Sequence, residues 1–152
     1  MKRLNILIPG PLKFRFIKEG VEEYKKRISG FAECRVIAPR IKIKSGDRLK
    51  EEERILKTHI EPRFYSIALD HRGKRLASSE EFAKYFENIL RDFPGINFII
   101  GGPEGLSEGL KKEVNMIISL SPLVFNHELA LLVLLEVIYR SFCIINKHPY
   151  HR

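Results

Sequence analysis

Asn97-Phe98-Ile99-Ile100-Gly101-Gly102-Pro103-Glu104-Gly105 is a short apolar run that passes directly into a loop rich in glycine and proline. The apolar run predicts a buried strand over residues 97–100, and the loop marks where that strand ends. Comparable runs occur at residues 4–8, 34–38, 64–69 and 116–120. Their apolar character is continuous and does not alternate, which is typical of parallel strands covered on both faces.

Helical patterns separate these runs, at residues 14–28, 47–60, 78–90, 107–114 and 127–144. Strands that alternate with helices predict βαβ units. We therefore expect an α/β protein with a parallel sheet and helices on both faces. A length of 152 residues fits one domain, spanning residues 1–152.

The last predicted helix is apolar around nearly its whole circumference, at positions 129, 131–135, 137 and 138. Such a helix must be buried on more than one side. One side can lie on the sheet. In a chain this small we expect the other side to meet a second copy, which predicts a homodimer.

The chain is strongly basic, with 27 lysines and arginines against 19 acidic residues, a net charge of +8 and a pI near 9.6. This excess points to a polyanionic partner such as nucleic acid or an anionic membrane. For any single lysine, a solvated helix face is the competing interpretation. The candidate phosphate contacts are Lys13, Arg15, Lys18, Lys25, Lys26, Arg27, Arg40, Lys42 and Lys44.

No segment reads as a membrane span or a signal peptide. The most apolar stretch, residues 129–145, is shorter than the ~20 residues a span needs, and the N-terminal apolar run is about five residues long. Cys34 and Cys143 sit in apolar runs, and no CxxC or other metal spacing occurs. These features predict a cytoplasmic protein with reduced thiols, no bound metal and no membrane partner.

Ligands in open α/β sheets bind outside the carboxyl ends of the strands. Three such ends carry polar or loop-forming residues, at 69–73, 101–105 and 120–125. Glycines there let backbone approach a ligand, while Leu120, Leu123 and Phe125 can pack against a flat ring. Neither GxGxxG nor GxxxxGK[ST] is present, and a Gly-Gly-Pro turn alone is more often structural. Asp70 fits a ribose or catalytic acid and a turn former equally well.

The C-terminal tail, residues 145–152, concentrates groups that hold anions or move protons near neutral pH. His148, Tyr150, His151 and Arg152 follow directly on the strongly apolar helix. Because a buried helix would hold the start of the tail in place, that position suggests a functional site. A solvated basic tail is an equally good interpretation of this segment alone, because termini often fray.

Together these segments resemble the RlmH family of SPOUT-class ribosomal RNA methyltransferases over essentially the whole chain. The motifs are Leu69-Asp70-x-x-Gly73-Lys74, Ile100-Gly101-Gly102-Pro103-Glu104-Gly105, Leu120-Ser121-Pro122-Leu123 with His127, Glu136-x-x-Tyr139-Arg140 and His148-Pro149-Tyr150-His151-Arg152. The resemblance implies the SPOUT methyltransferase fold, with a C-terminal trefoil knot, and a homodimer. It also implies methylation of N3 of a pseudouridine in large-subunit ribosomal RNA, on the assembled ribosome.

The resemblance further implies S-adenosyl-L-methionine as cofactor. Its expected contacts are Leu69, Gly101, Leu120, Ser121, Pro122, Leu123, Val124 and Phe125. The chain departs from the family pattern in the last helix. Asn126 stands where the family tends to have proline or threonine, Leu131 where it has arginine, and Val137 where it has glutamine.

Methylation at N3 requires loss of the imide proton, so the enzyme needs a base or cations that stabilise the anion. We hypothesise that His148 or His151 accepts the proton, that Tyr150 stacks on the base or donates to it, and that Arg152 stabilises base oxygens or a phosphate. Glu104 is a second candidate base, although it also fits a turn residue or a partner of Arg140. In a dimer, a tail could complete the partner's site.

Two other functions are compatible with the sequence. A non-catalytic RNA-binding or ribosome-assembly protein would explain the charge. It would not explain three intact loops with a reactive tail. A small nucleotide-binding enzyme, such as a hydrolase, would explain the loops but would not need the positive surface.

Overall fold

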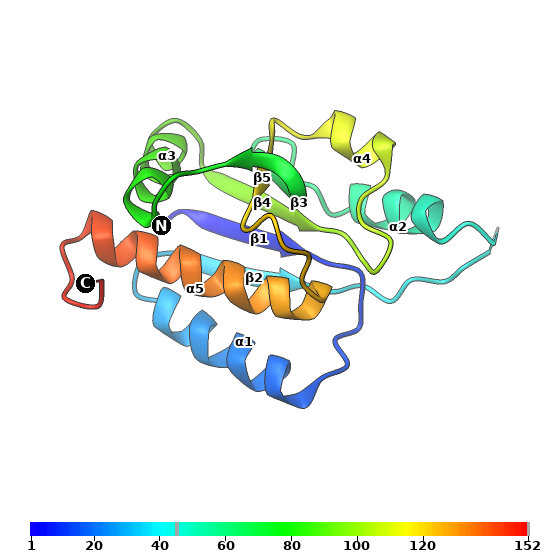
Figure 1. The fold of residues 1–152 in the computed structure, drawn as a ribbon, viewed down its shortest axis with the longest axis horizontal. Helices are drawn as coiled ribbons and strands as arrows, with labels where there is room; N and C mark the ends of the chain where they lie inside the picture. Colours follow the sequence, from blue (N-terminus) through cyan, green and yellow to red (C-terminus); the bar gives the residue numbers. More distant parts are fainter. Residues whose placement is uncertain (45, 152) are drawn as a thin grey trace.

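The computed structural model describes residues 1–44 and 46–151. Within them, five strands form one sheet in the order β2-β1-β4-β3-β5, and every neighbouring pair is parallel (Figure 1). The elements in chain order are β1 (Arg3–Leu7), α1 (Arg15–Ile28), β2 (Glu33–Ile37), α2 (Arg48–Lys57), β3 (Tyr65–Arg75), α3 (Ser79–Asp92), β4 (Gly95–Ile100), α4 (Glu108–Glu113), β5 (Met116–Ser119) and α5 (His127–Ile145).

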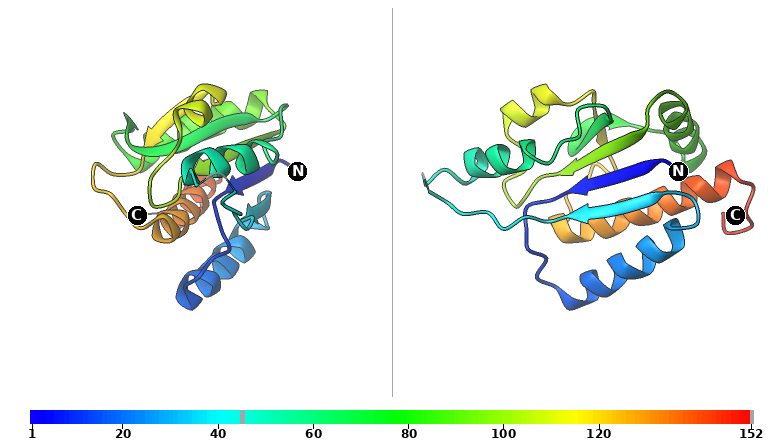
Figure 2. Two further views of the ribbon diagram at one scale, coloured as in Figure 1. Left: turned by 90° about the vertical axis from the view of Figure 1, so that its right-hand side faces the viewer. Right: turned by 180° about the vertical axis from the view of Figure 1, so that it is seen from behind.

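Helices cover both faces of this sheet, as predicted (Figure 2). Successive residues of a strand point to opposite faces. Ile6 and Phe98 therefore pack in the larger core, with α1, α3 and α5, while Leu7 and Ile99 pack in the smaller core, with α2 and α4. All four side chains are fully buried. Burial on both faces explains why the strands are continuously apolar.

Side-chain caps begin four of the five helices in the described residues. The Asp47 carboxylate accepts from the Lys50 amide, and the Ser107 hydroxyl accepts from the Leu110 amide. Asn126 caps α5 in the same way, accepting from Glu128 N at 2.9 Å. Ser78 caps α3 by accepting from the Glu81 amide at 3.1 Å. Asn126 thus starts the helix that follows the candidate site.

Helix α5 lies beneath the sheet between α1 and α3 (Figure 1). Leu131 and Leu135 are fully buried, so the position where the family tends to have arginine belongs here to the apolar core. The buried Glu128 carboxylate accepts from the backbone amides of Lys13, at 2.9 Å, and Phe14, at 3.1 Å. This contact fixes the start of α1 against the start of α5. The flanking helices account for much of the helix's apolar surface within a single protomer.

Two local expectations were wrong. The third strand continues past Leu69 to Arg75, because Leu69 and Lys74 both pair with Ile118 and residues 70–73 bulge between them. The second helix ends at Lys57, before the expected end at residue 60. Both errors arise because polar residues in these segments give no periodic signal.

No helix in the described part of the chain is long and apolar enough to cross a membrane. In residues 1–44 and 46–151, no group of three or more histidine, cysteine, aspartate or glutamate side chains could hold a metal ion.

Candidate active site

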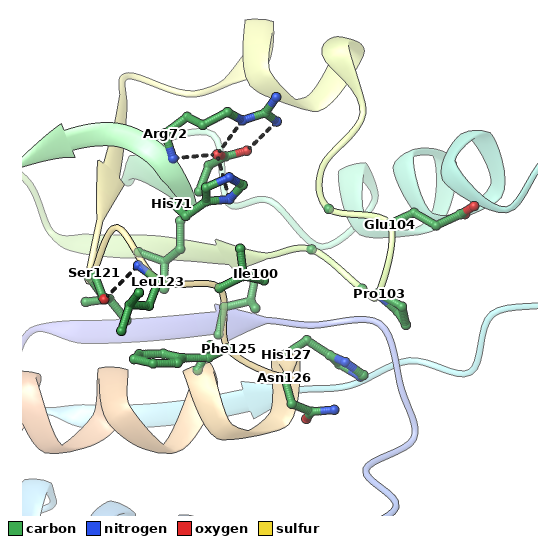
Figure 3. Close-up of a pocket in the computed structure, with 18 residues that line it drawn as sticks. His71, Arg72, Ile100, Pro103, Glu104, Ser121, Leu123, Phe125, Asn126 and His127 are labelled. Atoms are coloured by element: carbon green, nitrogen blue, oxygen red, sulfur yellow. Dashed lines mark hydrogen bonds and ion pairs between the residues drawn. The ribbon is translucent and has the colours of Figure 1, made fainter.

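The three loops predicted from the sequence converge at the carboxyl ends of β3, β4 and β5 (Figure 3). They enclose a cavity of about 560 Å³. That volume lies within the usual range of roughly 300–1,000 Å³ for small-molecule sites. Its lining includes seven of the eight predicted cofactor contacts: Leu69, Gly101, Leu120, Ser121, Leu123, Val124 and Phe125. Pro122 is exposed in the same loop and does not line the cavity.

The loop after β4 is a tight turn in which backbone packs against backbone. The amide of Gly105 donates to the carbonyl of Gly102 at 2.9 Å, and Gly105 has a φ of +81°, which favours glycine. A Cβ at Gly101 would collide with the Gly105 carbonyl group. Gly101 is therefore needed for this close approach between backbone segments, and the turn forms one rigid wall of the cavity.

The loop after β5 supplies an apolar wall. The Ser119 hydroxyl donates to the carbonyl of Ser121 at 2.7 Å, and the amide of Leu123 donates to the Ser121 hydroxyl at 3.0 Å. These bonds hold the loop with Leu123 and Val124 at 70% and 74% exposure. Together with Phe125, these side chains form an open apolar surface suited to a flat aromatic ring.

The cavity also has a polar rim that the sequence did not assign: His71, Arg72, Asn126 and His127 (Figure 3). Burial lowers the pKa of His127, with Glu128 opposing the effect, which favours a neutral imidazole near pH 7. The only sequence signal for His71 and Arg72 was their place directly after a strand.

Asp70 is an anchor in this rim and is not a free acid. Its carboxylate, 6% exposed, accepts from the Arg72 amide at 2.8 Å and from Arg72 Nε at 3.1 Å, and lies 3.4 Å from Lys111 Nζ. Hydrogen bonds from Arg72 chiefly hold the pKa of Asp70 well below its usual range, and the charge of Lys111 adds to this effect. The carboxylate is therefore ionised at neutral pH and held in place.

We expect Asp70→Asn to lower the free energy of unfolding by about 1–3 kcal/mol at pH 7, because two cations lose their partner. The native pKa lies below the unfolded value of about 3.9, so this stabilisation is present above about pH 4 and shrinks as the pH falls from about 4 toward the native pKa. Urea unfolding of both proteins between about pH 7 and about pH 2 measures the difference. A difference that stayed constant over this range would contradict the assignment.

Glu104 stands at the cavity rim but is exposed, and its carboxylate points away from Leu123 and Phe125 in Figure 3. Arg140 does not contact it but instead donates from its guanidinium to Glu136 at 2.7 Å. As a base it would have to turn toward the cavity.

The tail lies at the far end of α5 from the cavity (Figure 1). His127, at the start of this 19-residue helix, lines the cavity, and a helix of that length spans roughly 28 Å. The Tyr150 hydroxyl donates to Glu136 at 3.1 Å. His151 Nδ1 lies 3.0 Å from Arg140 Nη1, and its Nε2 lies 2.6 Å from Glu80 Oε1. The protomer thus does not bring its own tail to its own cavity. Arg152 lies outside the described residues.

Several of the basic residues of α1 form ion pairs along the helix. Arg15 pairs with Glu19 at 2.9 Å, and Arg27 pairs with Glu23 at 2.9 Å. Lys25 lies 3.7 Å from Glu22. Part of the charge predicted to hold phosphates is therefore compensated by acidic neighbours.

Comparison with known proteins agrees with this geometry. A family model described as "Predicted SPOUT methyltransferase" matches residues 1–151. A protein of Pseudothermotoga lettingae named "Ribosomal RNA large subunit methyltransferase H" is 38% identical, over 98% of this chain and 99% of its own length. One of the same name from Dictyoglomus thermophilum is 39% identical, over 97% and 98%.

The fold also resembles a solved structure, "Probable Methyltransferase from Bordetella pertussis Tohama I", with a TM-score of 0.62. The match covers 92% of this chain and 96% of that one. Because the two chains share only 18% identity, the match supports a shared fold alone. The near full-length relatives and the matching family model settle the classification. The chain belongs to the SPOUT methyltransferase family.

Proposed function

We propose that this chain transfers the methyl group of S-adenosyl-L-methionine to N3 of a pseudouridine in large-subunit ribosomal RNA, on the assembled ribosome. It would act in the cytoplasm as a single-domain protomer of a homodimer, with the C-terminal knot of its family. The observation that carries the proposal is the cavity at the strand ends, built from the three loops whose motifs resemble the family. The names of its relatives support the RNA substrate.

The residues around the cavity fit this cofactor. The apolar wall of Leu123, Val124 and Phe125 suits an adenine ring, and the Gly101 turn lets backbone groups come close to it. Within the polar rim, Asn126 and His127 suit the charged methionine end. When bound, the cofactor supplies an electrophilic methyl group on a sulfonium. The chain's task is to bind it, exclude water and position the nucleophile, which can supply several kcal/mol of the barrier reduction.

The tail is the best candidate for handling the N3 proton. His148 is exposed, and its Nδ1 accepts from the Tyr150 amide at 3.2 Å. Arg140 is an obligate donor, so His151 Nδ1 accepts from it, and the proton of a neutral ring is then on Nε2, facing Glu80. To receive the imide proton, directly or through water, either histidine must first give up the hydrogen bond that its Nδ1 accepts here. Tyr150 would stack on the base, and Arg152 would stabilise its oxygens.

The distance between tail and cavity favours a site shared between protomers. A two-fold interface uses the same surface on both copies, so one tail at the partner's cavity implies the reciprocal contact. Leu129, in the first turn of α5, is 40% exposed, and Leu123 and Val124 in the loop before that helix are exposed as well. Exposed large apolar side chains suit a protein partner.

Labelled S-adenosyl-L-methionine and purified ribosomes that lack the modification test the proposal. We expect label at N3 of a pseudouridine in large-subunit RNA, and none on free nucleosides. Ribosome and cofactor binding without label would instead favour the non-catalytic RNA-binding function. Label on free nucleosides would favour a small-molecule enzyme.

A further inference from the structure

The C-terminal end of β3 carries a group of basic residues to which the proposed function assigns no role. His71, Arg72, Lys74 and Arg75 are all exposed there, and Lys111 of α4 lies beside them. We call these five residues the basic edge. Asp70 and Glu108 are the carboxylates in contact with it, so four permanent cations face two acids.

The backbone of the basic edge is held by the sheet. Lys74 and Arg75 pair with Ile118 and Ser119 of β5, which places them in a defined strand. A Cβ at Gly73 would lie 2.8 Å from the backbone carbon of Ile118, so the bulge packs directly against β5. The cations therefore stand on a fixed backbone, which lowers the entropy cost of binding a ligand.

Asp70 also holds two of the cations, Arg72 and Lys111, in fixed positions. Both of its oxygens accept from the Arg72 guanidinium, at 3.1 and 3.2 Å, while the Arg72 side chain remains 68% exposed. An arginine has five N–H donors, so the others can still face a ligand. An arginine held this way is suited to phosphate, which it can bind through two parallel hydrogen bonds.

The basic edge borders the cavity, since His71 and Arg72 are part of its lining. We propose that the basic edge binds backbone phosphates of the substrate RNA beside the target nucleotide. Such contacts set the register and orientation of the nucleic acid without reading its sequence. This role rests on the proposed function. It adds a positioning surface separate from the partly ion-paired face of α1.

The test compares ribosome binding and cofactor binding for three variants of the full chain. Lys74→Ala/Arg75→Ala and Arg72→Gln alter the basic edge. Arg35→Ala/Arg63→Ala is the matched control for the double variant: it removes the same charge from two exposed sites, one in β2 at the opposite edge of the sheet and one just before the start of β3. Ribosome affinity is measured across a salt series, and the affinity for S-adenosyl-L-methionine is measured separately.

We expect Lys74→Ala/Arg75→Ala to weaken ribosome binding by about tenfold or more, and to reduce the slope of log affinity against log salt by about 1.5. Arg72→Gln should weaken ribosome binding as well. Both should keep cofactor affinity within about twofold of wild type, and the control should change neither property.

The proposal is overturned if the basic-edge variants bind ribosomes like the control. It is also overturned if Arg72→Gln lowers cofactor affinity instead, because the anion held there would then be the cofactor's carboxylate. Methyl transfer by the wild-type chain is scored independently. Ribosome binding that depends on the basic edge without methyl transfer would support the surface and refute the enzymatic function.

Discussion

Removal of residues 148–152 is expected to lower methyl transfer to ribosomes by at least about 10³-fold. The reason is that the tail supplies both the candidate bases and the tyrosine that would position the nucleobase. Affinity for S-adenosyl-L-methionine should stay within about twofold of wild type, because the cavity is lined by residues between Leu69 and Ala130. Single-turnover transfer and equilibrium cofactor binding separate the two effects.

A folding defect would imitate this result, so point variants of the full-length chain are the control. Tyr150→Phe removes the hydroxyl that donates to Glu136 and keeps the ring, whose centroid lies 4.7 Å from that of Tyr139. It should retain most of the activity if the ring stacks on the base. His148→Ala and His151→Ala should differ in methyl-transfer activity. The larger loss of activity is expected in the variant that lacks the histidine that takes the proton. A truncated chain that still methylated, or that lost the cofactor, would contradict the assigned role.

Gly101→Ala is expected to weaken binding of S-adenosyl-L-methionine by about 100-fold and to abolish transfer at ordinary cofactor concentrations. The added methyl group would meet the carbonyl of Gly105, and backbone cannot move aside as a flexible side chain can. The turn must therefore shift, and one wall of the cavity shifts with it. Isothermal titration of the cofactor into the purified variant measures the effect.

Gly30→Ala provides the matched control, because a Cβ at Gly30 would meet nothing within 4 Å. It makes the same chemical change in a loop away from the cavity, and should leave cofactor affinity unaltered. Wild-type affinity in Gly101→Ala would show that the turn does not bind the cofactor. Equal losses in both variants would point to a general effect on stability.

Much of the fold could be predicted because its signals are local. Strands such as β4 are continuously apolar, and the Gly101-Gly102-Pro103 loop marks where that strand ends. The candidate cavity followed from one rule, that ligands bind at the carboxyl ends of parallel strands. These signals depend on neighbouring residues only, so one sequence is enough to see them.

What the sequence could not show depends on contacts between distant residues. The extension of β3 pairs Lys74 with Ile118, and no local pattern reveals such pairing. The apolar circumference of α5 suggested a second copy, yet α1 and α3 already flank the helix. The sequence predicts catalytic residues in the tail but does not show where the tail lies. Because α5 begins at the cavity and is 19 residues long, the tail lies at the opposite end of the protomer.

Because the tail and the cavity lie at opposite ends of the protomer, a site shared between two protomers can be tested with two inactive proteins. A chain that lacks residues 148–152 keeps its cavity, and a full-length Gly101→Ala chain keeps its tail. Coexpression with different affinity tags allows the mixed dimer to be purified. If each site combines one cavity with the partner's tail, the mixed dimer has one complete site and the other site lacks both parts.

Methyl transfer from labelled S-adenosyl-L-methionine to unmodified ribosomes by this mixed dimer is the deciding measurement. A site shared between protomers predicts about half of the wild-type activity per dimer, recovered from two parents that are each inactive. A mixed dimer as inactive as its parents, beside an active wild type, would contradict a site shared between protomers.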